Sequence, residues 1–217
     1  MKKIAVYGAG GFGREVQMLI NQINNFEKKF DFIGFFDDGI KQGQLINNYP
    51  VIGGMSELNR IKEPVELVFA IADPKTKKNL ELQIINPKIN YPVLIHPNAL
   101  IGDMEYVKIG DGSIIAAGSI ITVNIEIGRH VILNLSCTIG HDTRIGDYSS
   151  FMPAVNVSGE VNIAEGVYAG TGAKIINQLD IGEFTVIGAG SVVNKSLPAH
   201  CTAVGVPAKP IKFNNNI

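Results

Sequence analysis

The sequence predicts an α/β domain at the N-terminus followed by an all-β domain built from stacked coils. Two observations predict this organisation: a glycine-rich turn between an apolar strand and a helix, and a six-residue repeat that extends over residues 109–198. The patterns change near residue 92. We therefore expect one domain over residues 1–92 and a second over residues 93–217.

Composition excludes several classes of protein. The 217 residues carry 19 Lys and Arg against 20 Asp and Glu, a balance that argues against nucleic-acid binding and against a polybasic membrane-surface protein. An apolar content of 46% excludes a disordered chain. Two cysteines make no disulfide framework, and no apolar run reaches the ~20 residues of a membrane span. We expect a cytoplasmic protein without membrane insertion.

The first domain begins with an apolar strand, Lys3–Tyr7, that leads into the glycine-rich segment Gly8–Gly13 and then into a helical pattern. A second strand, Phe32–Phe36, ends in Asp37 and Asp38. The glycines match G-x-G-x-x-G in the strand–turn–helix context that gives this motif its meaning. Backbone amides at such a turn can meet a phosphate, and acids after the second strand can bind ribose hydroxyls. This predicts a Rossmann-like nucleotide site.

The rest of this domain alternates in the same way. We expect a helix near Met55–Ile61, a strand at Val65–Ile71, a helix at Lys75–Ile85 and a strand at Val93–Ile95. About 90 residues supply little more than one mononucleotide-binding half, which favours a single nucleotide attached to another group. A nicotinamide cofactor, and glycines that only pack a helix against a strand, remain open alternatives.

The second domain follows a repeat of six. Fifteen consecutive hexads begin at Ile109 and run without insertion, and none of the thirty residues at their first and fifth positions is charged. Glycine occupies seven of the fifteen second positions, which suits a corner that needs close backbone approach or a positive φ. Ile95 and Ile101 begin earlier hexads, with Val107 and Lys108 as a two-residue insertion. Such a register indicates a β-solenoid whose coils share one core.

Five further segments carry a family resemblance: Gly8-Ala-Gly-Gly-Phe-Gly13, Phe36-Asp-Asp38, Ile95-His-Pro97, Cys137-Thr-Ile-Gly-His-Asp142 and Val204-Gly-Val-Pro-Ala-Lys209. With the repeats, they resemble the hexapeptide-repeat sugar acetyltransferases related to sialic acid O-acetyltransferase. This group includes enzymes that acetylate the 4-amino group of UDP-, GDP- or dTDP-linked dideoxy sugars in surface glycan biosynthesis. The resemblance implies a left-handed parallel β-helix with eighteen residues per coil, so that residue n lies beneath residue n+18. It also implies a homotrimer that binds acetyl-CoA between subunits, a nucleotide sugar in the first domain, and no metal.

The four histidines differ in their expected roles. His96, before Pro97 at the domain junction, is expected to be structural, and His200 is expected to lie in a loop. His130, fourth in its hexad, is expected to point into solvent. His141 is third in its hexad, at a corner, and Asp142 follows it. A carboxylate beside an imidazole raises its basicity.

The resemblance makes His141 the general base and Asp142 the acid that tunes it. Gly159 lies one coil above His141, where the missing side chain leaves a backbone amide approachable, and we predict that this amide binds the oxyanion. Cys137 is fifth in its hexad and is expected to pack inside the coil. Ser150 stands where some relatives carry a second histidine that contacts the acetyl group.

Two further sets of residues follow from the resemblance alone. The expected acetyl-CoA contacts are Ser150, Thr171, Gly188, Ala189 and Gly190, with Gly205 and Lys209 at the adenine end. The expected nucleotide-sugar contacts are Gly10, Gly11, Phe12, Asp37, Asp38 and Ala72.

Three other functions are compatible with parts of this pattern to different degrees. A sugar O-acetyltransferase of the sialic acid type and a non-catalytic nucleotide-sugar-binding protein remain open. A zinc enzyme like the γ-class carbonic anhydrases needs three converging histidines. His130 and His141 are eleven residues apart, which does not stack them, and no third histidine is suitably placed.

Overall fold

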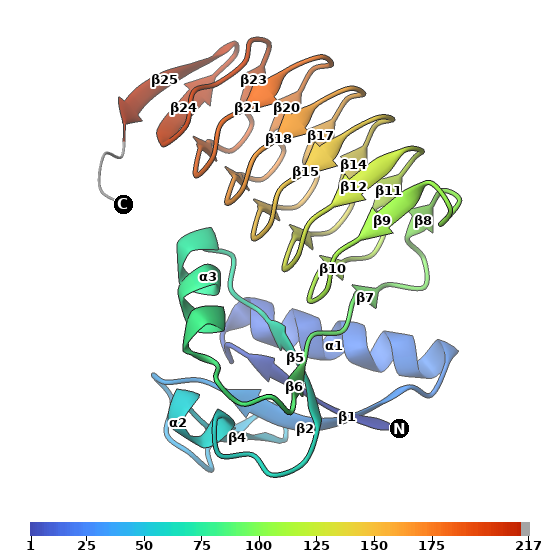
Figure 1. Cartoon of the computed structure of the whole chain (residues 1–217), viewed down its shortest axis with the longest axis vertical. Helices are drawn as coiled ribbons and strands as arrows, with labels where there is room; N and C mark the ends of the chain where they lie inside the picture. Colours follow the sequence, from blue (N-terminus) through green and yellow to red (C-terminus); the bar gives the residue numbers. More distant parts are fainter. Residues whose placement is uncertain (214–217) are drawn as a thin grey trace.

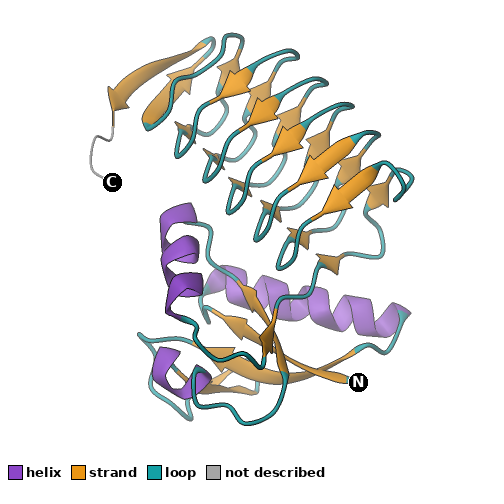
Figure 2. Ribbon diagram, viewed as in Figure 1, coloured by secondary structure: helices purple, strands orange, loops and turns teal. Residues whose placement is uncertain are grey.

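The computed structural model describes residues 1–213 and has the predicted fold class, an α/β domain joined to a left-handed parallel β-helix (Figures 1 and 2). In both views the α/β domain lies against one side of the β-helix, at the N-terminal end of the β-helix. Within residues 1–213 no helix is long and apolar enough to cross a membrane.

The α/β domain is one six-stranded sheet in the order β3-β4-β2-β1-β5-β6. All neighbouring strands pair in parallel except β3 and β4, which pair antiparallel. The elements are β1 (Lys2–Tyr7), α1 (Gly11–Phe26), β2 (Phe30–Phe36), β3 (Leu45–Ile46), β4 (Tyr49–Gly53), α2 (Met55–Leu58), β5 (Val65–Phe69), α3 (Pro74–Gln83) and β6 (Ile89–Asn90). After β1 the chain forms β2, which pairs with one edge of β1. It later forms β5, which pairs with the other edge of β1. The carboxyl ends of β1 and β5 therefore form a topological switch point, where open α/β sheets bind ligands.

The β-helix is a triangular prism with three parallel faces, apart from one antiparallel strand at its C-terminal end. Face 1 contains β7 (Leu94–Ile95), β10 (Ile114–Ile115), β13 (Ile132–Leu133), β16 (Ser150–Phe151), β19 (Tyr168–Ala169), β22 (Val186–Ile187), β24 (Cys201–Gly205) and the antiparallel β25 (Ala208–Phe213). Face 2 contains β8 (Leu100–Ile101), β11 (Ile120–Ile121), β14 (Thr138–Ile139), β17 (Asn156–Val157), β20 (Lys174–Ile175) and β23 (Val192–Val193). Face 3 contains β9 (Val107–Ile109), β12 (Ile125–Ile127), β15 (Arg144–Ile145), β18 (Asn162–Ile163) and β21 (Asp180–Ile181). The chain visits the faces in this order, so the corners are 1–2, 2–3 and 3–1.

Strand pairing has the predicted spacing of eighteen through most of the prism, as in Ile114 with Ile132 and Glu126 with Arg144. Two details of the expected register are wrong. Leu94 pairs with Ile114 and Leu100 with Ile120, both twenty apart, whereas Val107 already pairs with Ile125. The two extra residues therefore lie in the turn 102–106, and Val107 and Lys108 belong to β9. At the other end Leu197 bridges to Ile181, only sixteen residues away, so the strict spacing stops after Val193.

The prism core consists of the first and fifth hexad positions, and every one of these residues is buried except Ile109 and Leu179. Several fifth positions are Ser or Thr, whose hydroxyls donate to backbone carbonyls of the same coil. Ser113 donates to the Gly128 carbonyl at 2.9 Å and Thr185 to the Pro198 carbonyl at 2.7 Å. Because these polar groups are paired, their burial carries no unsatisfied hydrogen bond.

The second-position glycines allow close approach between coils. A Cβ on Gly140 would lie 2.6 Å from the Gly159 nitrogen, and one on Gly128 would lie 2.3 Å from the Asp147 carboxylate. Positive φ occurs elsewhere, at fourth positions that mostly carry side chains: Asn124, His130, Ser136, Asp142, Tyr148, Ala154, Glu160, Gln178 and Phe184. Of the two reasons expected for glycine at the second position, only close approach applies.

Candidate active site

His141 and Asp142 meet at corner 2–3, between β14 and β15. The Nδ1 atom of His141 lies 2.8 Å from the Asp142 carboxylate, and both side chains are about half exposed. Consecutive residues of a strand point to opposite faces, but Asp142 has a left-handed backbone (φ 56°) that breaks this alternation. The corner thus brings the predicted base and acid together.

A third residue, from the coil below, forms a hydrogen bond to Asp142. Asn124 Nδ2 donates to the other Asp142 carboxylate oxygen at 2.9 Å. Hydrogen bonds from Asn124 and then His141 lower the pKa of Asp142 below its usual value. Asn124 was not predicted as a site residue, although the stacking rule finds it, because 124 plus 18 is 142.

Gly159 lies against the His141 ring from the coil above. A Cβ at position 159 would be 2.5 Å from both Cε1 and Nε2 of His141. Any side chain there would displace the imidazole, so glycine is required for the ring's position. Within residues 1–213 the Gly159 amide donates to no protein acceptor. The His141 ring therefore packs against Gly159, a residue whose backbone amide is unpaired.

The residues expected to bind acetyl-CoA are together at corner 1–2, near the C-terminal end of the prism. Thr171, Ala189 and Gly190 are exposed, and the Gly190 amide donates to the Thr171 carbonyl at 2.8 Å. Gly188 packs against Val204, where a Cβ would be 2.7 Å from the valine side chain. Gly205 and Lys209 lie on either side of the exposed turn between β24 and β25. Face 2 separates this corner from His141.

Ser150 lies elsewhere. It is fully buried on face 1, where its hydroxyl oxygen is 2.8 Å from Nζ of Lys77, a residue of α3. A group sealed under α3 has no open path to a ligand on corner 1–2 or 2–3. We therefore leave Ser150 out of the site. Lys77 itself was missed by the sequence reasoning, because a lysine in a polar helix gives no sign of burial.

The expected nucleotide-binding residues come together at the carboxyl edge of the sheet. Gly10 caps α1 without a side-chain hydrogen bond, and a Cβ there would meet nothing within 4 Å. Gly8 has φ 101°, and Gly13 touches the Gly8 carbonyl so closely that a Cβ would overlap it at 2.0 Å. Ala72 lies at the same edge, between β5 and α3. The glycines thus form a tight turn with open space over its outer side.

Asp37 and Asp38 also hold this edge together. Asp37 accepts hydrogen bonds from the amides of Ala9 and Gly39, at 2.9 and 2.8 Å. Asp38 accepts from the Met55 amide at 2.9 Å and from the Tyr7 hydroxyl. Burial and then this hydrogen bond raise the pKa of Tyr7. Both carboxylates therefore have structural partners, which the sequence reasoning did not foresee.

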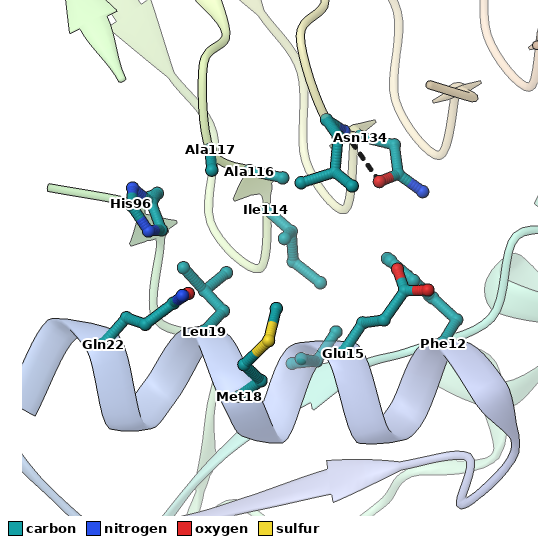
Figure 3. A pocket seen from close by; sticks show the side chains of 12 residues that line it. Phe12, Glu15, Met18, Leu19, Gln22, His96, Ile114, Ala116, Ala117 and Asn134 are labelled. Carbon is teal, nitrogen blue, oxygen red and sulfur yellow. Dashed lines mark hydrogen bonds between the residues drawn. The ribbon is translucent and has the colours of Figure 1, made fainter. Parts of the chain in front are cut away.

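A pocket opens between α1 and corner 1–2 of the first coils (Figure 3). In this view Phe12, Glu15, Met18, Leu19 and Gln22 rise from α1 toward the prism. The prism side is lined by His96, Ile114, Ala116, Ala117, Asn134 and Leu135. The lining is mainly apolar, and Phe12 belongs to it rather than to the exposed glycine turn.

The remaining histidines and cysteines have structural positions. His96 is buried, and its Nδ1 accepts from the Asn98 amide at 2.9 Å. His200 stacks on Phe184 at a corner turn. Cys137 is buried, and burial raises the pKa of its thiol to about 12. Within the described residues, no three His, Cys, Asp or Glu side chains are grouped to hold a metal ion.

The expectation for His130 was wrong. Its side chain is fully buried at corner 3–1, between Phe69, Tyr91 and Tyr148, and its Nε2 lies 3.2 Å from the Glu81 carboxylate of α3. The fourth hexad position does point outward, but the α/β domain covers this corner.

Comparison with known proteins decides the family. Residues 3–83 match the PglD N-terminal domain. GDP-perosamine N-acetyltransferase of Escherichia coli O157:H7 is 33% identical over 218 residues, which cover 98% of this chain and 97% of that protein. The chain belongs to the GDP-perosamine N-acetyltransferase family.

Solved structures agree with this family assignment. WeeI from Acinetobacter baumannii AYE has a TM-score of 0.87 at 34% identity, covering 97% of this chain and all of that one. PerB from Caulobacter crescentus, in complex with CoA and GDP-perosamine, has a TM-score of 0.85 at 27% identity over 98% of both chains. The acetyltransferase domain of PglB from Neisseria gonorrhoeae FA1090 has a TM-score of 0.88 at 30% identity, covering 97% of this chain and all of that domain.

Proposed function

We propose that this protein transfers the acetyl group of acetyl-CoA to the amino group of a nucleotide-linked 4-amino-dideoxy sugar. The geometry of this corner carries the proposal: His141 is exposed, its Nδ1 is held by Asp142, and its ring packs against Gly159, whose amide is unpaired. A base and a hydrogen-bond donor next to each other are what acyl transfer needs. The family relationship supplies the substrate class.

Asp142 fixes the tautomer of His141. Nδ1 carries the proton and donates to the carboxylate, so the lone pair is on Nε2. As the sugar nitrogen attacks the acetyl carbonyl carbon, Nε2 takes the proton that this nitrogen loses. A positioned base of this kind contributes on the order of 10²–10⁴ in rate.

The Gly159 amide donates a hydrogen bond to the carbonyl oxygen and so stabilises the negative charge that develops there. Because residue 159 has no side chain, its N–H group can approach the thioester carbonyl whose attack His141 assists. When the tetrahedral intermediate collapses, the carbon–sulfur bond breaks and the CoA sulfur takes the proton from Nε2. A thiol with a pKa near ~8.5 is a good leaving group, so this step needs little further assistance. The products are the N-acetyl sugar and CoA.

We assign acetyl-CoA to the prism. Thr171 and Gly188–Gly190 lie where the pantetheine arm would pass, and Gly205 and Lys209 where the adenine end would rest. The amides of Thr171 and Ala189 make no hydrogen bond within residues 1–213 and are free for a ligand. Lys209 is exposed and can offset a phosphate charge.

We assign the nucleotide sugar to the domain of residues 1–92, and acetyl transfer to that of residues 93–217. The diphosphate fits the start of α1 at Gly10 and Gly11, and the nucleoside fits the edge at Asp37, Asp38 and Ala72. The apolar pocket beside Phe12 suits the deoxy part of the sugar. Acetyl-CoA and nucleotide sugars are cytoplasmic metabolites, and we place the enzyme there.

We further propose a homotrimer. The α/β domain covers face 1 through α1 and α3, whereas His141 is at corner 2–3, which is opposite face 1. A nucleotide sugar held by one subunit therefore needs the His141 corner of a neighbouring subunit. Face 2 also exposes apolar side chains at its N-terminal end, Leu100 and Ile120, that a neighbouring prism could cover.

The activity is tested with purified protein, acetyl-CoA and a panel of UDP-, GDP- and dTDP-linked 4-amino sugars. We expect thiol release that depends on one amino sugar, with mass spectrometry placing the acetyl group on nitrogen. Acetyl esters on a hydroxyl would identify a sugar O-acetyltransferase instead. Binding of a sugar nucleotide without any thiol release would identify a non-catalytic binding protein.

The assembly is tested by co-expressing two inactive variants, His141→Asn and Gly10→Trp, with different tags. If sites form between subunits, mixed trimers contain some sites with an intact His141 corner and an intact glycine turn. We expect partial recovery of activity in the doubly tagged fraction. No recovery, or a fully active monomer in light scattering, would contradict the shared site.

A further inference from the structure

Helix α3 docks on the prism without an apolar face. Its sequence, Pro74–Gln83, is polar on nearly all sides, and only Pro74 and Lys77 are buried. A helix that is polar all round gains little from hydrophobic burial, and one of its known uses is to bridge domains. Polar contacts must hold α3 in place.

These contacts follow corner 3–1 upward through four coils. Glu81 pairs with Arg129 and accepts from Tyr148, Lys78 pairs with Glu165, and the ammonium groups of Lys75 and Lys78 lie over the Phe184 ring at 5.7 and 5.6 Å. Ten helical residues rise about 15 Å. Three spacings of stacked strands, at ~4.8 Å each, give nearly the same length. The helix therefore runs along this corner with matched length.

Lys77 is the buried centre of this contact. It is the one lysine among residues 1–213 that is fully buried, and its Nζ lies 2.8 Å from the His130 carbonyl and 2.8 Å from the Ser150 hydroxyl. The Ser149 carbonyl lies at 3.4 Å. Burial lowers the pKa of Lys77 well below its usual value, and none of its three partners is a carboxylate. Because an unpaired buried amine is destabilising, these partners allow α3 only one position along the prism.

The other end of α3 is tied directly to the nucleotide-binding edge. The Ala70 amide donates to the Tyr7 carbonyl at 2.8 Å, which fixes the end of β5 to β1. Asp73 then caps α3 by accepting from the Thr76 amide at 2.8 Å. Only Ile71 and Ala72 lie between these two fixed points. A shift of α3 along the prism would therefore move the edge that Ala72 helps to form.

We propose that Lys77 is a positioning residue for acetyl transfer: by fixing α3 on corner 3–1, it sets the place of the nucleotide-binding edge relative to the prism. The inference rests on the proposed function, because it concerns how a sugar held by one domain reaches a thioester held by the other. Displacement of a bound reactant by 1 Å can reduce turnover about 10²-fold without changing the reacting groups.

The test compares Lys77→Met with Lys78→Met in the full-length protein. Both replace a lysine of α3 by methionine, but Lys78 makes only a partly exposed ion pair and ring contact, for which a small effect is expected. In assays at temperatures well below the melting temperature of the variant, we expect Lys77→Met to lower kcat for the sugar nucleotide about tenfold or more. The Kd of acetyl-CoA and the Kd of the free nucleoside diphosphate should change less than twofold. Lys78→Met should keep kcat within twofold of the wild type.

A purely structural role predicts a different result. Lys77→Met would then melt at a lower temperature but turn over normally per folded molecule, and that result overturns the proposal. If Lys77→Met fails to fold, Ser150→Ala is the second variant: it removes one hydrogen-bond partner of Lys77 with little change in side-chain volume. A reduction of kcat by about threefold, with an unchanged acetyl-CoA Kd, supports the proposal, and unchanged kcat overturns it. An inactive wild type would refute the proposed function separately.

Discussion

His141 and His130 are eleven residues apart on the same β-helix, and each has a carboxylate near its ring. Each ring also rests against a glycine of the adjacent coil, Gly159 above His141 and Gly112 below His130. Their surroundings differ. The His141 side chain is 56% exposed and that of His130 is 0% exposed.

The difference shows that a His–carboxylate pair becomes catalytic through what is left free around it. At His141 the second ring nitrogen and the Gly159 amide are both available to a ligand. At His130 the ring is enclosed by Phe69, Tyr91 and Tyr148, and burial lowers its pKa despite the nearby Glu81. The first pair can accept a proton from a substrate, whereas the second fills an interface.

The largest expected effect comes from removing the base. His141→Asn should reduce kcat by about 10²–10⁴, because the ring nitrogen that accepts the proton is lost. The melting temperature and the acetyl-CoA Kd should stay near wild type, since the ring is exposed. Turnover assays with calorimetry check this, and turnover within threefold of the wild type would remove His141 as the base.

Gly159→Ala tests the contact between ring and amide. The new Cβ would lie 2.5 Å from the His141 ring, so the imidazole must move away from the carbonyl it serves. We expect a loss of about 10²-fold in kcat. Gly43→Ala in the α/β domain is the control, because no atom lies within 4 Å of its Cβ position and no ligand contact is assigned there, although its φ of +84° adds backbone strain. Equal losses of activity in both variants would show that the effect is not local to the ring.

Asp142→Asn should have a smaller effect. Asparagine still offers an oxygen to Nδ1 but carries no charge to stabilise the protonated ring, so we expect kcat to fall about tenfold. Asn124→Ala, which removes only the hydrogen bond to Asp142, should reduce kcat less. Steady-state kinetics of the two variants check this order, and the reverse order would contradict the role given to Asp142.

His130→Asn should affect stability rather than turnover. Asparagine tolerates the left-handed backbone at this position (φ 53°), but the lost ring leaves space among three aromatic rings. We expect the free energy of unfolding to fall by about 2 kcal/mol at neutral pH, with kcat per folded molecule near wild type. Chemical denaturation with parallel turnover assays separates the two effects.

The same variant gives a pH dependence. Because burial lowers the pKa of His130 in the folded protein, only the unfolded chain takes up the proton just below pH ~6.5. The wild type therefore loses this part of its stability as the pH falls through that range. His130→Asn lacks the group, so the stability gap between the two proteins should narrow from pH 7.5 to pH 5.5. Glu81, Arg129 and Lys77 lie near this position in both proteins, and His130 helps to lower the pKa of Glu81. In the wild type the Glu81 carboxyl therefore titrates below the pH range compared here.

The sequence predicted a β-solenoid and the hexad position of His141, because both depend on local spacing. A strict period of six indicates which residues enter the core. The coil of eighteen residues, which stacks Gly159 on His141, is implied by the family resemblance, and the same rule would have found Asn124 under Asp142. The burial of His130, Ser150 and Lys77 could not be predicted in the same way. Their environment depends on where the α/β domain packs against the prism. The polar sequence of α3 has no apolar stripe from which packing against the prism could be predicted.

The eighteen-residue coil also limits how the length of this protein can change. The two departures from the spacing, of two residues each, lie at corners and leave every strand on its own face. Deletion of a single hexad N-terminal to His141 would instead move every later residue to the preceding corner. His141 would then lie at corner 1–2, to which acetyl-CoA is assigned. Loss of three hexads returns each residue to its corner. Insertions and deletions in homologous prisms should therefore occur as whole coils or as short changes within turns.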